Sequence, residues 1–270
     1  MGTSDVTDGS ATSEHEHVSF WPLVAAVGAG SLYAGVGLLL VGLGLVPTFI
    51  PILLIVFGST GLVGGLAGWL YEAFLAEYWA DSHDDRTPLY VSGMLLFLVS
   101  DISTFLGGFI YYAFIRVGTW PPSELPPLLS SLVLVNTLLL VASSFTLHYG
   151  HSALERGNRR RFHVGLGLTV ALGVVFLAGQ AFEYYEFVVS EDFTLTSGAF
   201  ASAFFGLTGL HGLHVTLGVV LLGIVFGRAI RGQYTPDREA SVETVELYWH
   251  FVDVVWILLV VVVYVGAALG

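Results

Sequence analysis

The sequence predicts an all-α membrane protein with seven transmembrane helices. Of its 270 residues, 55% are hydrophobic and only 11% are charged, and the mean hydropathy is +0.79. A soluble domain carries roughly 25% charged residues, so most of this chain does not face water. Seven apolar segments are long enough to cross a bilayer, which takes about 20 residues each. We expect spans at 21–45, 48–71, 88–115, 126–149, 162–188, 198–228 and 247–269.

Residues 1–19 precede the first span and are polar and acidic, with no arginine or lysine. A secretory signal would begin with a positive region, so we expect a disordered acidic tail here. The whole chain has 21 acidic residues against 9 basic ones, all arginine, which argues against nucleic-acid binding. Such an acidic, lysine-free chain suits molar salt and predicts a halophilic source. Without cysteine, disulfides and thiolate metal sites are excluded.

Residues 20–75 contain the first two spans, 76–87 form a polar connection, and 88–270 contain the other five. Small residues four apart in the second span (Gly61 and Gly65, Gly64 and Gly68) predict close packing against the glycine-rich first span. Seven spans put the N-terminus and the even-to-odd connections on one side. That side holds eight arginines against Arg116 alone on the other, which predicts a cytoplasmic N-terminus and an external C-terminus.

Ionisable residues inside the spans are the candidate functional residues, because charge is costly in hydrocarbon. Asp101 lies near mid-membrane in the third span, about 20 Å from its start. It could be a proton-active or lipid-anchoring carboxyl, or a protonated acid bonded to a neighbouring helix. Gln180 and Glu183 share one face of the fifth span, followed by Tyr184 as an interface anchor.

The sixth and seventh spans carry histidines at helical spacing. His211 and His214 are three apart, so they cannot ligate one haem from opposite sides; we expect buried, hydrogen-bonded histidines that join helices. His148, His151 and His163 are expected at the interface. In the seventh span, Glu246, Trp249, His250 and Asp253 form either a proton-linked cluster or a structural knot that docks onto a partner. These residues predict no metal or catalytic site in this chain.

Two segments resemble signatures of cytochrome c oxidase subunit III. Residues 207–218 (LTGLHGLHVTLG) are similar to the TGxHGxHVxxG motif, and residues 248–256 (YWHFVDVVW) to the motif of the last helix. Residues 177–187 (LAGQAFEYYEF) and 93–114 also resemble the family, although Asp101 stands where the family usually has glutamate. The similar segments run in order along nearly the whole chain.

The resemblance implies two helix bundles, I–II and III–VII, around a V-shaped cleft filled with phospholipid. It also implies a non-catalytic subunit of an oxidoreductase and translocase that reduces oxygen to water and translocates protons. Haem and copper would belong to the partner subunits I and II, and this chain would hold no cofactor except lipid. We expect lipid-cleft or proton-related roles for Trp69, Glu72, Asp101, His214 and Arg228, and structural roles for Gln180, Glu183, Tyr184, His211, Trp249, His250 and Asp253.

The expected location is the plasma membrane. Alternatives are a subunit III-like partner of a quinol oxidase or nitric oxide reductase, and, in other classes, a b-type cytochrome or a transporter. Haem in the isolated chain would indicate the cytochrome. A transporter often shows internal repeats, and we find no repeat between the two halves of this sequence.

Overall fold

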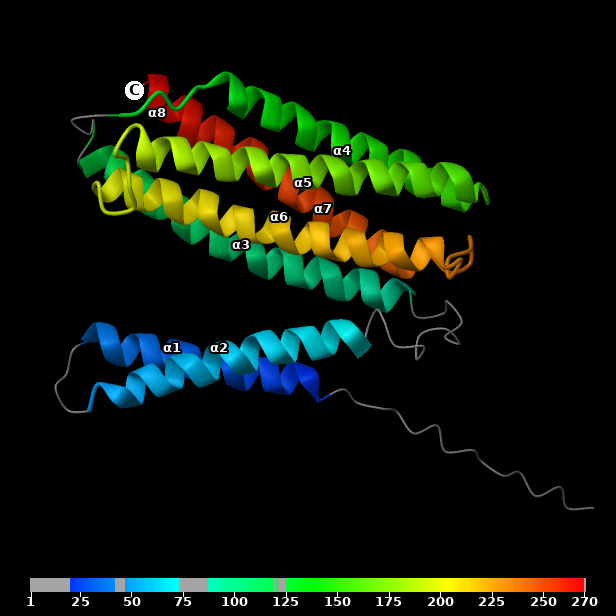
Figure 1. Ribbon diagram of the computed structural model, residues 1–270, viewed down its shortest axis with the longest axis horizontal. Helices are drawn as coiled ribbons and strands as arrows, with labels where there is room; N and C mark the ends of the chain where they lie inside the picture. The colour runs from blue at the N-terminus through cyan, green and yellow to red at the C-terminus, as the bar shows by residue number, and fades with distance from the viewer. Residues whose placement is uncertain (1–19, 42–46, 73–86, 119, 121–124, 270) are drawn as a thin grey trace, which may run out of the picture. The chain divides into compact units, whose positions relative to one another are not determined.

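The computed structural model describes residues 20–41, 47–72, 87–118, 120 and 125–269, and these residues contain helices and connections but no strand (Figure 1). Seven helical segments in this described part are long and apolar enough to cross a membrane. The predicted all-α class with seven membrane-spanning helices is therefore confirmed. The helices are α1 (Trp21–Val41), α2 (Phe49–Leu70), α3 (Thr87–Gly118), α4 (Ser131–Glu155), α5 (Arg159–Val189), α6 (Ala199–Ile230) and α7 (Ala240–Leu259), the last continued by η4 (Val260–Val265) and α8 (Gly266–Leu269).

The chain divides into two compact units, Met1–Trp79 and Ala80–Gly270, and each is described by itself. The expected acidic tail, 1–19, lies outside the described residues. So does nearly all of the expected connection 76–87, of which only Thr87 is described.

In the first unit, α1 and α2 pack through glycines at close approach. A Cβ added to Gly61 would lie 3.2 Å from the Cα of Gly28, and one added to Gly65 or Gly58 would collide with the α1 backbone. The predicted pairing of the first two spans through small residues is thus confirmed. Gly64, the other small residue predicted to pack here, differs: a Cβ added to it would meet no described atom within 4 Å.

In the second unit, α4, α5 and α6 run side by side, and α7 contacts α3, α4 and α6 (Figure 1). The central position of α7 explains its large aromatic side chains. Trp249 and Trp256 on α7 and Tyr264 on η4 are completely buried. By contrast, the side chains of Leu96 and Phe114 on α3 are each 73% exposed, as expected for a helix that faces hydrocarbon.

Two helix starts differ from their predicted positions by five residues or more. The fourth span begins at Ser131, not at Pro126, because the Ser130 hydroxyl accepts from the Val133 amide and caps the helix there. The seventh begins at Ala240, seven residues before the apolar run, because a helix can extend past the hydrocarbon into its polar rim. This extension places Glu246 in the second turn of a continuous helix.

Candidate functional site: buried polar residues of the second unit

Asp101 on α3 and His214 on α6 form a buried pair. The Asp101 Oδ2 lies 3.0 Å from the His214 Nε2, and Asp101 is only 9% exposed. The His214 ring also stacks near Phe105 and Tyr248, and the Tyr248 hydroxyl donates to the His214 carbonyl. The carboxylate predicted at mid-membrane therefore has a partner on a neighbouring helix, and the pair connects α3 to α6.

Two contacts fix the orientation of the His214 ring. The Nδ1 lies 2.7 Å from the Leu210 carbonyl, which can only accept, so Nδ1 carries a hydrogen. The Nε2 faces the Asp101 carboxyl within ion-pair distance, although Asp101 Oδ2 has no aligned hydrogen-bond donor among the described residues.

His211 does not share this arrangement, although it lies on the same helix one turn away. Its ring is fully buried, stacks on Trp256 with ring centroids 5.2 Å apart, and meets the Phe176 ring edge to face. Neither ring nitrogen has a hydrogen-bond partner among the described residues. The expectation that both histidines are hydrogen-bonded is therefore wrong for His211, which aromatic contacts hold in place.

Glu183 on α5 lies at the centre of a second buried network. The Gln180 amide donates to the Glu183 Oε2 at 2.7 Å, and the Tyr264 hydroxyl donates to the same oxygen at 2.9 Å. Tyr184 contacts the Thr208 hydroxyl on α6 at 2.6 Å. The predicted shared face of Gln180 and Glu183 is confirmed as a direct contact, and the Tyr264 hydroxyl joins this pair to η4.

Serines of α4 make three of the polar contacts that join this helix to α7. Trp249 Nε1 donates to the Ser143 hydroxyl at 2.9 Å, and the Ser144 hydroxyl contacts both Asp253 and the His250 Nδ1. Trp249, His250 and Asp253 therefore contact two serines of α4 within this chain. The proton-linked cluster and the knot that docks onto a partner both stay predictions.

A polar cluster lies where α4 ends and α7 begins. Glu246 meets three imidazoles: His151 Nδ1 in a close contact, His148 Nδ1 at 3.5 Å and His250 Nε2 at 3.4 Å. His151 also faces Glu239 with its other nitrogen. Burial raises the pKa of the Glu239 carboxyl above its usual range; Glu155 adds to this rise in pKa, and His151 opposes it.

The remaining candidate residues lie near helix ends. In the first unit, the Trp21 indole donates to the Glu72 carboxylate at 3.0 Å, and Trp69 is 40% exposed. In the second unit, the Arg228 side chain donates to Gln233 at 2.9 Å and lies over the Tyr234 ring. Tryptophan and arginine at such positions are typical of membrane interfaces.

Several partners in these networks could not be identified from sequence. Ser143, Ser144, Thr208 and Tyr264 belong to residue types that are common in any membrane helix, and only packing reveals their role. The spacing of His151 and Glu155, four apart at the end of α4, was the one available signal for the cluster with Glu239.

Comparison with known proteins agrees with these features. The family model described as "Cytochrome c oxidase subunit III" matches residues 17–268. A protein named "Cytochrome c oxidase subunit 3" from Synechocystis sp. is 42% identical over 188 residues, covering 68% of this chain and 79% of that protein. The protein of that name from Scyliorhinus canicula is 35% identical over 253 residues, covering 90% of this chain and 93% of that protein. The one from Schizophyllum commune is 36% identical over 216 residues, covering 77% of this chain and 79% of that protein.

Proposed function

Because this chain belongs to the cytochrome c oxidase subunit III family, we propose that it is the non-catalytic subunit III of a haem-copper terminal oxidase. The observation that carries the proposal is the family match over residues 17–268, nearly the whole chain. The complex would reduce oxygen to water in aerobic respiration and couple the reaction to proton translocation. This subunit would stabilise the catalytic subunit and support its proton uptake.

The internal contacts of the second unit support a structural role for most of the buried polar residues. The Glu183 network, the Asp101–His214 pair and the α4–α7 contacts each join two helices. The His211 ring is covered by Trp256 and Phe176, which favours packing over cofactor ligation. On this proposal, haem and copper are held by subunits I and II, and this chain contacts subunit I directly.

Phospholipid is the ligand that we propose for this chain itself. Its helices expose large apolar side chains, including Leu53 and Val63 on α2 and Leu96 on α3, which alkyl chains can cover. Trp69 and Glu72 at the end of α2, and Arg228 at the end of α6, are placed at helix ends, where headgroups would meet indole, carboxylate and guanidinium groups. The Asp101–His214 pair would lie deeper, beside the apolar tails. The membrane would be the plasma membrane, with the N-terminus cytoplasmic.

The test is purification of the tagged chain in mild detergent, followed by identification of the co-purifying proteins, an absorption spectrum and an oxygen-consumption assay. We expect a large haem-containing subunit and cyanide-sensitive oxygen consumption. A lone chain with stoichiometric haem would replace the proposal with a b-type cytochrome, and a lone colourless chain would favour a transporter. Reduction by quinol but not by cytochrome c or a copper protein would assign the complex to the quinol oxidases instead.

The supporting role has its own measurement. Complex that lacks this chain should begin with normal activity but lose it during turnover faster than complete complex, and adding the purified chain back should slow the loss. Equal rates of inactivation with and without the chain would contradict the protective role but would leave the assignment as subunit III unaffected.

A further inference from the structure

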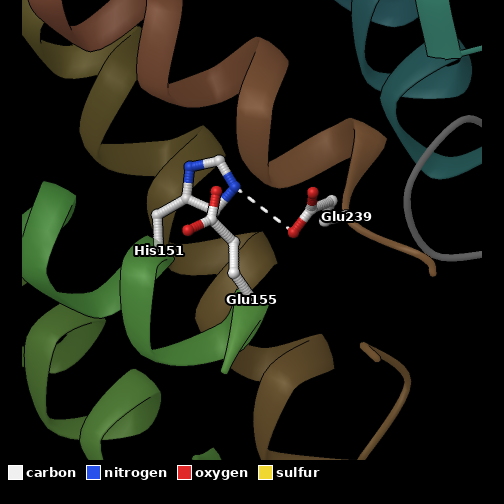
Figure 2. Close-up of side chains that lie close together, drawn as sticks. All are labelled: His151, Glu155 and Glu239. Carbon is white, nitrogen blue, oxygen red and sulfur yellow. Dashed lines mark ion pairs between the residues drawn. The ribbon is translucent and has the colours of Figure 1, made fainter. Parts of the chain in front are cut away.

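Three potential metal ligands converge where α4 ends and α7 begins. His151 and Glu155 lie one turn apart at the end of α4, and Glu239 is the residue that precedes α7. Each offers one ligand atom, and the three atoms lie within 4.8 Å of one another. Figure 2 shows the Glu155 carboxylate beside the His151 ring and the ring nitrogen directed at Glu239.

The orientation of His151 is fixed from its other side. Its Nδ1 contacts the Glu246 carboxylate, which accepts and therefore keeps the hydrogen on Nδ1. A carboxylate behind a ligating histidine is the usual arrangement in metal sites, because it orients the ring and makes the free nitrogen more basic. The Nε2 on the other side of the ring then faces Glu239.

The facing atoms, His151 Nε2 and Glu239 Oε2, are both buried and have no hydrogen-bond partner in the described part of the chain. They lie 3.5 Å apart. A tetrahedral ion about 2.0–2.1 Å from each ligand atom holds two ligand atoms roughly 3.3–3.4 Å apart, so these two atoms are spaced as ligands of one ion.

We propose that His151, Glu155 and Glu239 bind a divalent first-row transition-metal ion, with Zn²⁺ the best fit. One imidazole and two carboxylates suit Zn²⁺, whereas Mg²⁺ and Ca²⁺ take oxygen ligands. Glu155 is exposed, so its side chain can turn toward the ion. The three residues leave the fourth coordination position of the ion to water. The inference departs from the sequence prediction that this chain holds no metal site, and it does not depend on the oxidase assignment.

Such an ion would cross-link the last turn of α4 and the start of α7, two segments that are far apart in sequence. It would also neutralise the charge of two carboxylates that lie close to the His151 ring. Glu246 and its histidine neighbours His148 and His250 would surround the ion without ligating it. The role of the ion would be structural, because its ligands join two helix ends.

The test uses the full chain purified in mild detergent with the subunits that accompany it. After removal of adventitious metal with a chelator, Zn²⁺ per complex is measured by elemental analysis, and Co²⁺ is added as a spectroscopic substitute. Wild type is expected to bind one Zn²⁺ more per complex than Glu239→Gln, and to show the intense visible bands of four-coordinate Co²⁺, which the variant should lose. Glu246→Gln should weaken Zn²⁺ binding about 10- to 100-fold.

Glu243→Gln is the matched control, since it removes the same charge from the first turn of α7 and should leave binding unchanged. Glu155→Gln is a second test variant on an exposed side chain, so its loss of binding cannot be ascribed to misfolding. The same Zn²⁺ stoichiometry and Co²⁺ spectrum in wild type, Glu155→Gln and Glu239→Gln would overturn the proposal and place any bound ion elsewhere in the complex.

Discussion

Replacing Asp101 tests how much the Asp101–His214 contact contributes to stability. In Asp101→Asn the side chain keeps its size and a polar end that can meet the His214 Nε2. In Asp101→Ala the Nε2 loses the group that it faces, since His214 is held in place by Phe105 and the Leu210 carbonyl. We therefore expect the asparagine variant to fold with nearly the wild-type free energy of unfolding, and the alanine variant not to.

The magnitude follows from the cost of an unpaired buried polar group. That cost is about 1–3 kcal/mol, and for a unit of this size each kcal/mol lowers the midpoint of thermal unfolding by about 2–4 °C. Asp101→Ala should thus unfold roughly 2–12 °C below wild type. The assay is the fraction of this chain that stays soluble after heating the purified complex, read by immunoblot so that only this chain is followed.

A double substitution separates the pair from its surroundings. Asp101→Ala combined with His214→Ala should cost less than the sum of the single changes, because the first change already leaves the imidazole unpaired. If Asp101→Asn lowers the midpoint as far as Asp101→Ala, or if the double variant is strictly additive, the reasoning about the Asp101–His214 contact is refuted.

Three other predictions concern other parts of the chain. Tyr264→Phe keeps the buried ring but removes one of the two donors to Glu183, so it should lower the free energy of unfolding by about 1–3 kcal/mol, read in the same heating assay. An unchanged midpoint would show that the Gln180 amide alone satisfies the Glu183 carboxylate. Gly58→Leu should force α1 and α2 apart and lower the midpoint, whereas Gly64→Leu on the open side of α2 should not; equal effects would contradict the glycine contact. Burial raises the pKa of Tyr234, so the folded state keeps the phenol proton above the unfolded-state pKa of about 10, and the free energy of unfolding falls as the pH rises from there. Tyr234→Phe should therefore lose less stability than wild type between pH 9 and about 11. Parallel plots of stability against pH for the two proteins would refute this contribution.

Sequence alone predicted the helical class and number because hydrocarbon imposes a local requirement. Each span must be apolar over its own length and must satisfy its own backbone, so neither property depends on the rest of the fold. The same locality allowed the contact of Gln180 with Glu183 and the pairing of α1 with α2 to be predicted, since spacing along a helix fixes which side chains share a face. The halophilic source, the bilayer orientation and the lipid cleft stay predictions.

Only the tertiary structure decided which buried polar groups meet. His211 and His214 have the same spacing from their neighbours and the same surroundings in sequence, yet one packs among aromatic rings and the other pairs with Asp101, because they point at different helices. Likewise, the partners Tyr264, Ser144 and Glu239 are remote in sequence from the residues that they contact. Helical periodicity reports the direction of a side chain around its own axis, whereas its partner depends on how the helices pack.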